Sequence, residues 1–164
     1  PFLNCDTTPE LIWATGLGVQ ALSRNSNTLP ATLAGPVAGP GTKTILYENS
    51  AFTAAMVASG VSVMESSHSS SGGSIPRHGS GLDSKICAEV THAVSGKSRE
   101  EANELVKKLI PLYEVDYKNK PFGKPFEEVY DIEKIEPTAE WQGMYDDVLE
   151  TLSGFGLNMN RRAW

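Results

Sequence analysis

Short apolar runs alternate with helical patterns over the first 96 residues of the chain. The runs at 2–6, 29–34 and 61–65 have the length of buried strands. A loop rich in Gly, Pro, Ser or Thr follows each run, and a segment with apolar residues at helical spacing follows each loop. Strand, loop and helix therefore recur in the same order three times. This order predicts parallel strands joined by right-handed crossovers, and hence an α/β protein.

Cap chemistry predicts where these helices begin and end. Thr8 followed by Pro9 is typical of a helix N-terminus, with the hydroxyl as N-cap and proline in the first turn. The second helix is expected over 43–59, because Gly60 is suited to the position just past a helix end. The third is expected to begin at Gly81. The inner face of the first helix is expected to consist of Leu11, Ile12, Thr15, Val19 and Leu22.

Beyond Gly96 the sequence changes to charged helical segments. A capping box of the form Ser-x-x-Glu stands at 98–101, and a last helix is predicted over about 138–152. The segment 126–135 has a mixed pattern that favours neither helix nor strand. We therefore expect two parts, three βα units in 1–96 and a helical extension packed on them in 97–164.

The loop expected over 66–81 is the most promising place for chemistry. It follows a strand, is rich in serine and glycine, and leads into a helix N-terminus, where free backbone N–H groups attract anions. His68 in this loop has the chemistry of a general base or a hydrogen-bond donor, but it is equally typical of an exposed loop. Arg77, His78 and the glycines of the loop suit either a phosphate site or a flexible lid. Walker A, Rossmann and Gly-x-Ser-x-Gly patterns are absent from the sequence.

Composition and charge narrow the class of partner. The 164 residues correspond to about one domain, and a net charge of -6 argues against nucleic acid or an anionic membrane as the main partner. No apolar run approaches the ~20 residues that span a bilayer. The two cysteines, Cys5 and Cys87, lie far apart, which favours a reducing, cytoplasmic location. The scattered histidines and cysteines have no metal-ligand spacing, so no metal site is expected.

Many short matches in a fixed order make the chain similar to a known family. They cover the residues 38–42, 48–51, 58–60, 81–85, 88–91, 112–117, 123–131 and 137–146. In this order and spacing they resemble the C-terminal part of the monomethylamine:corrinoid methyltransferases of methanogens. No single match is diagnostic, but together they span nearly the whole chain.

The resemblance implies the last three βα units of a (β/α)8 TIM barrel, followed by C-terminal helices. It also fits a chain that begins at Pro1, within an apolar run, as if cut from a longer protein. Members of this family use pyrrolysine to bind and activate a methylamine, and pass the methyl group to the Co(I) corrinoid of a separate protein in methanogenesis. The pyrrolysine position lies upstream of this segment. The resemblance therefore implies an enzyme, a methyltransferase, with a corrinoid protein and a small methylated amine as partners.

The loops 4–8, 33–42 and 66–81 would then shape the substrate cavity and receive the corrinoid protein. The residues expected to line the cavity, without being the activating group, are Asn4, Asp6, Gly35, Ser67 and His68. The catalytic group itself is not identified in this segment.

Two other functions are compatible with the same residues. One is a non-catalytic α/β domain that binds a phosphorylated small ligand through the 66–81 loop. The other is a scaffold piece that assembles with an upstream chain. In each case three βα units would leave two open sheet edges. We therefore expect either a homo-oligomer or the rest of a barrel to cover these edges.

Overall fold

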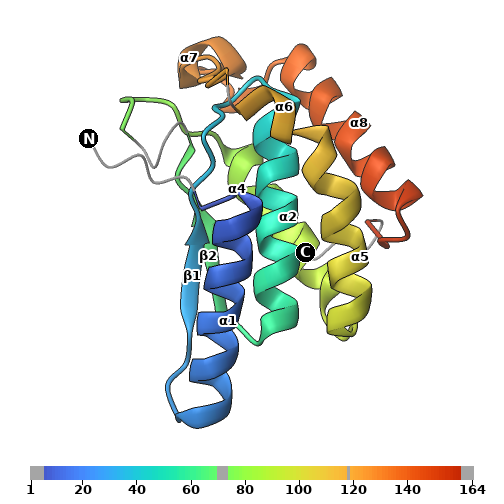
Figure 1. The fold of residues 1–164 in the computed structure, drawn as a ribbon. Helices are drawn as coiled ribbons and strands as arrows, with labels where there is room; N and C mark the ends of the chain where they lie inside the picture. Colours follow the sequence, from blue (N-terminus) through green and yellow to red (C-terminus); the bar gives the residue numbers. More distant parts are fainter. Residues whose placement is uncertain (1–5, 70–73, 118, 160–164) are drawn as a thin grey trace.

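The computed structural model describes residues 6–69, 74–117 and 119–159 and is a helix-rich α/β fold. Its first part contains α1 (Pro9–Asn25), β1 (Ala31–Ala34), α2 (Lys43–Ser59), β2 (Val63–Ser67) and α4 (Gly81–Val94), shown in Figure 1. The second part contains α5 (Arg99–Leu109), the 3-10 turn η1 (Ile110–Leu112), α6 (Glu114–Tyr117), α7 (Phe126–Val129), β3 (Tyr130–Asp131), β4 (Glu136–Pro137) and α8 (Ala139–Gly154).

The two strands β1 and β2 pair in parallel, as the repeated order of elements predicts. Ala31 lies opposite Val63, and the register shifts before Ala34 pairs with Ser67. Strand β1 begins two residues later than expected and ends at the expected position, whereas β2 lies two residues later at both ends. Consequently Ser67 belongs to β2 and not to the loop that was expected to begin at 66. Of the strand expected at 2–6, only Asp6 lies within the described residues, and it is in an irregular segment.

The predicted helix ends are confirmed. The Thr8 hydroxyl accepts a hydrogen bond from the backbone N–H of Leu11 at 3.3 Å, and α1 begins at Pro9. Helix α2 has the predicted bounds, with Gly60 at φ 98° as its C-cap. This backbone conformation favours glycine because it has no Cβ. Local side-chain chemistry is therefore sufficient to place these boundaries.

The inner face predicted for α1 is only partly correct. Ile12 and Val19 are buried, but Leu11 and Leu22 are 44% and 49% exposed. The buried stripe includes Gly16, whose missing side chain leaves room for Ser59 and Met56 of α2. The close approach of α1 to α2 therefore rotates two leucines toward the surface.

Helix α2 is the centre of the described fold. Figure 1 shows it beside α1 and between the strands and α5, and it also packs against α4 and α8. Its apolar side chains Ile45, Leu46 and Phe52 are fully buried. Polar side chains on the same helix are also buried, because α1, α4, α5 and α8 all pack against it and leave no face open to solvent along much of its length.

The segment 121–131 crosses the loop after β1. The backbone N–H of Gly39 donates to the Pro121 carbonyl at 3.0 Å, and that of Lys124 donates to the Pro40 carbonyl at 2.8 Å. Gly123, at φ +74°, lies against this carbonyl, so that an added Cβ would overlap the Pro40 oxygen. The stretch 121–124, just before the segment that had no clear sequence pattern, is thus held by pairing with a distant loop.

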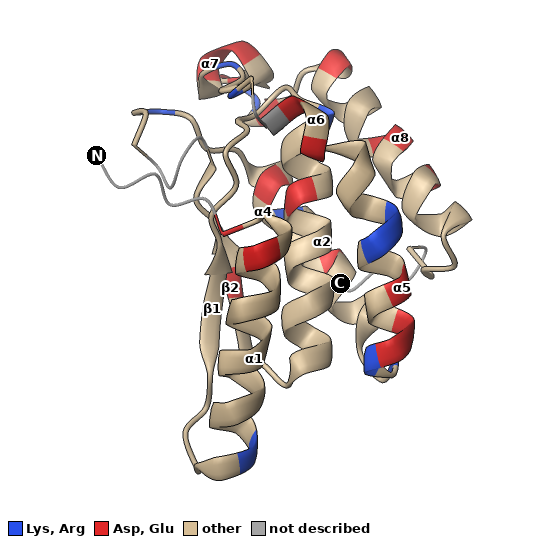
Figure 2. Ribbon diagram, viewed as in Figure 1, with Lys and Arg blue, Asp and Glu red and all other residues tan. Residues whose placement is uncertain are grey.

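Charged residues lie mostly on the helices of the second part and on α4. Figure 2 shows acidic positions over α4, α5, α7 and α8, whereas β1 carries no charged residue. Within the described ranges, no helix combines the length and apolar character needed to cross a membrane.

Candidate functional site

The loops that follow the parallel strands meet at the carboxyl end of β1 and β2. There the Gly35 N–H donates to the Asp6 carboxylate at 2.7 Å, and the Asp6 N–H donates to the Gly35 carbonyl at 3.2 Å. Burial raises the pKa of Asp6 to about 6, against the lowering effect of the Gly35 hydrogen bond. Two of the predicted site residues are therefore in direct contact, and one is a carboxylate that titrates near neutral pH.

Ser67 and His68 lie at the end of the neighbouring strand. The Ser67 hydroxyl donates to the Asn49 side-chain oxygen at 3.1 Å. The His68 backbone N–H donates to the Ala34 carbonyl at 2.9 Å, and its side chain is exposed. The backbone of His68 is thus held beside Gly35. Asn4 lies outside the described residues, and the binding roles of all five predicted residues remain predictions.

Glu48 of α2 is a candidate site residue that the sequence pattern did not indicate. Its carboxylate is fully buried and accepts hydrogen bonds from the Thr7 hydroxyl at 2.6 Å and from the backbone N–H groups of Val37 and Ala38 at 3.0 and 2.9 Å. Burial raises the pKa of Glu48, and these three donors lower it. The Thr7 carbonyl in turn accepts a hydrogen bond from the Tyr113 hydroxyl at 2.7 Å.

A second buried carboxylate, Asp83, lies in the first turn of α4. It accepts hydrogen bonds from the Ser80 N–H at 2.8 Å and from the Ser80 hydroxyl at 2.9 Å. Burial raises its pKa to about 6. The Trp141 indole N–H of α8 donates to the same Ser80 hydroxyl at 3.1 Å. The Ser-x-x-Asp spacing is a capping signal that could have revealed this contact from the sequence.

The loop before α4 is tied down by further contacts. The Ser69 hydroxyl donates to the His78 carbonyl, and the Phe126 N–H donates to the Arg77 carbonyl at 2.7 Å. The Arg77 guanidinium pairs with the Glu127 carboxylate at 2.7 Å. The described part of the loop is therefore anchored to α7, while residues 70–73 lie outside the described part of the chain.

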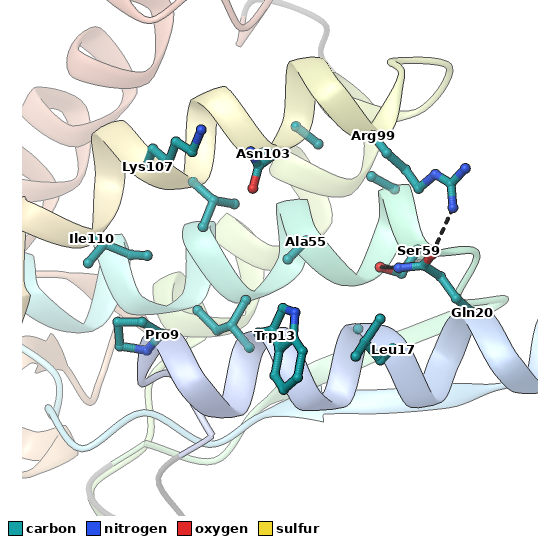
Figure 3. A pocket seen from close by; sticks show the side chains of 15 residues that line it. Pro9, Trp13, Leu17, Gln20, Ala55, Ser59, Arg99, Asn103, Lys107 and Ile110 are labelled. Atoms are coloured by element: carbon teal, nitrogen blue, oxygen red, sulfur yellow. Dashed lines mark hydrogen bonds between the residues drawn. The ribbon is translucent and has the colours of Figure 1, made fainter.

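A groove of about 270 Å³ lies elsewhere, between α1, α2 and α5. Figure 3 shows Trp13 and Leu17 on one wall and Asn103 on the other, with the Arg99 guanidinium bound to the Gln20 side-chain oxygen at 2.7 Å. None of the described residues predicted for the site lines this groove. In the parts of the chain that the structure covers, no cluster of His, Cys, Asp or Glu could hold a metal ion.

Parallel strands with helices packed on them, and with polar loops meeting at their carboxyl ends, define an α/β protein of the type that binds ligands at that edge. The family model described as monomethylamine methyltransferase MtmB matches residues 3–157. The chain therefore belongs to this family, which confirms the resemblance found in the sequence.

Individual relatives agree with this assignment. The chain is 33% identical over 150 residues to monomethylamine methyltransferase MtmB2 of Methanosarcina acetivorans and to MtmB of Methanosarcina mazei, covering 92% of this chain and 32% of each relative. The crystal structure of the Methanosarcina barkeri monomethylamine methyltransferase MtmB matches with a TM-score of 0.86 and 31% identity, over 93% of this chain and 33% of that one. A crystal structure of a hydroxylamine MtmB complex matches equally well. The chain thus spans about a third of the length of these relatives.

Proposed function

We propose that this chain is part of a methyltransferase that moves a methyl group from monomethylamine to a corrinoid protein. The observation that carries the proposal is the match to MtmB structures over 93% of the chain at a TM-score of 0.86. In this proposal residues 1–96 are the last three βα units of a (β/α)8 barrel, and 97–164 are a helical extension. The parallel pairing of β1 with β2 supports this arrangement.

The reaction breaks the C–N bond of the amine, releases ammonia, and forms a bond between the methyl carbon and cobalt. The corrinoid, carried by the partner protein, supplies the Co(I) nucleophile. A pyrrolysine that activates the amine would stand upstream of this segment. The residues of this chain would line the cavity and orient the amine. Asn4, Asp6, Gly35, Ser67 and His68 are the residues proposed for this role.

Asp6 is the proposed residue with the clearest chemistry. Its carboxylate is only partly buried, and one oxygen is held by the Gly35 N–H. With a pKa of about 6, it is largely ionised at neutral pH and can attract the ammonium form of the substrate. We therefore propose that Asp6 contributes to methylamine binding and not to breaking the C–N bond.

The alternative, a phosphorylated ligand bound through the loop before α4, has less support. Asp83 already places a carboxylate in the first turn of α4, where a phosphate would have to bind. The negative charges of the carboxylate and a bound phosphate would repel each other, and solvent ions screen such repulsion only weakly at a buried site. In the intact barrel the missing βα units would cover the unpaired edges of β1 and β2, and without them a second copy of the chain would have to do so. A homo-oligomer is therefore proposed for the chain by itself, together with a cytoplasmic location.

The test uses the full-length protein with its corrinoid protein reduced to Co(I). Addition of monomethylamine should convert the absorption spectrum from Co(I) to methyl-Co(III), whereas dimethylamine should give a slower conversion or none. Asp6→Asn should raise the KM for monomethylamine, and Glu150→Gln, at an exposed position of α8, should leave it unchanged. Absence of methyl transfer from any methylated amine would refute the proposed function.

A further inference from the structure

Two adjacent polar residues in the middle of α2, Glu48 and Asn49, are fully buried. Burying a carboxylate or an amide costs free energy unless hydrogen bonds replace those to water. A pair of apolar residues would fill the same space without that cost. The hydrogen-bond partners of these two side chains therefore indicate their role.

Glu48 binds segments that lie before α1 and after β1. Its carboxylate accepts the Thr7 hydroxyl, directly after Asp6, and the N–H groups of Val37 and Ala38, two and three residues after Gly35. Three donors converge on its two oxygens, which satisfies the carboxyl group in its buried position. Glu48 thus fixes the two segments that carry the Asp6–Gly35 contact.

Asn49 binds the end of β2 and the beginning of α4. Its side-chain oxygen accepts the Ser67 hydroxyl at 3.1 Å, and its side-chain nitrogen donates to the Asp83 carbonyl at 3.1 Å. Both ends of the amide are used. Neighbouring positions on one helix therefore hold four separate segments around the carboxyl ends of the strands.

We propose that Glu48 and Asn49 are positioning residues that set the geometry of the substrate cavity by fixing the loops after the strands. This inference rests on the proposed function, since it concerns the same cavity. Neither side chain needs to touch the amine. Glu48 would act through Thr7, Val37 and Ala38 on the Asp6–Gly35 contact, and Asn49 would act through Ser67.

Glu48→Gln in the full-length protein is the direct test. Glutamine keeps the shape of the side chain. Its NH₂ group, however, must face an N–H or O–H group that now donates a hydrogen bond to the carboxylate. Loop amides should then lose protection, so that hydrogen exchange at 35–41 accelerates. A misplacement of about 1 Å caused by a substitution far from the reacting atoms can cost about 100-fold in rate. Glu48 acts on Asp6, which is proposed to bind the amine and not to break the C–N bond. We therefore expect a loss of about this size in kcat/KM, most of it as a rise in the KM for monomethylamine and with a smaller change in kcat.

The exposed Glu150→Gln is the matched control and should change neither exchange nor kcat. If Glu48→Gln does not fold, Thr7→Val replaces it, since it removes one donor to Glu48 at nearly constant volume. It should raise the KM for monomethylamine less than Glu48→Gln does, and it should accelerate exchange around residues 6–8. A folded variant with unchanged exchange in these loops overturns the proposal, even if activity falls. If the wild-type protein transfers no methyl group, the proposed function fails, and the exchange measurement alone decides the positioning role.

Discussion

Replacing Gly123 by alanine would separate the segment 121–124 from the loop after β1. At φ +74°, alanine adopts a conformation that costs about 1–2 kcal/mol relative to the right-handed region. Its Cβ would also lie 2.7 Å from the Gly39 carbonyl oxygen and closer still to that of Pro40. Both are backbone atoms, so the contact cannot be relieved by a side-chain rotation.

The overlap between the added Cβ and these carbonyl oxygens is relieved only if the two backbone segments move apart. The hydrogen bonds from Gly39 to Pro121 and from Lys124 to Pro40 would then lengthen or break. Each backbone hydrogen bond contributes about 0.5–1.5 kcal/mol net. Added to the conformational cost, their loss predicts that Gly123→Ala lowers the free energy of unfolding by about 2–5 kcal/mol.

Urea unfolding of the full-length protein, followed by circular dichroism, measures this change. Gly143→Ala is the matched control, because an added Cβ at this position in α8 meets nothing within 4 Å. In a helix interior that substitution should stabilise by about 0.5–1 kcal/mol. A Gly123→Ala variant that loses less than about 0.5 kcal/mol would refute the reasoning.

Two further predictions concern α4. Because burial raises the folded-state pKa of Asp83 from 3.8 to about 6, its contribution to stability is present below pH 4 and is lost as pH rises through 6. Unfolding free energies measured from pH 4 to 7 should therefore fall less steeply in Asp83→Asn than in the wild type. Gly81→Ala should cost about 1–3 kcal/mol, because its Cβ would lie 2.9 Å from the Tyr130 hydroxyl oxygen. Tyr130→Phe, which removes that oxygen, should restore most of this loss in a thermal melt.

If the unfolding free energy depends on pH equally steeply in the wild type and in Asp83→Asn, the pKa of Asp83 does not change on folding in this pH range. If the Gly81→Ala, Tyr130→Phe double variant is as unstable as Gly81→Ala, the Tyr130 hydroxyl is not the group that the added Cβ overlaps.

The sequence predicted best what depends on local chemistry. Thr8 and Gly60 set helix ends through their own hydroxyl or backbone freedom, and the structure confirms both. The parallel pairing of β1 and β2 followed from the repeated order of elements. Asp6 and Gly35 were expected at one edge for the same reason, and they are in direct contact.

What depends on distant packing was not predicted. Glu48 lies in a helix that looks half exposed in sequence. Its side chain is buried and accepts hydrogen bonds from distant segments, Thr7 before α1 and the loop after β1. Leu11 and Leu22 have the right spacing for a buried face, but Gly16 sets the contact with α2 instead. The segment 126–135 has no periodicity of its own because its order comes from pairing and contacts with other loops.

The contact between the segment 121–124 and the loop after β1 also bears on the order of folding. The Gly39 and Lys124 hydrogen bonds join parts of the chain that are far apart in sequence, so the long intervening stretch must close before they form. During synthesis on the ribosome, the loop after β1 emerges well before its partner. The loops at the carboxyl ends of β1 and β2 are therefore expected to reach their final conformation late in folding, after the helices that pack on the strands.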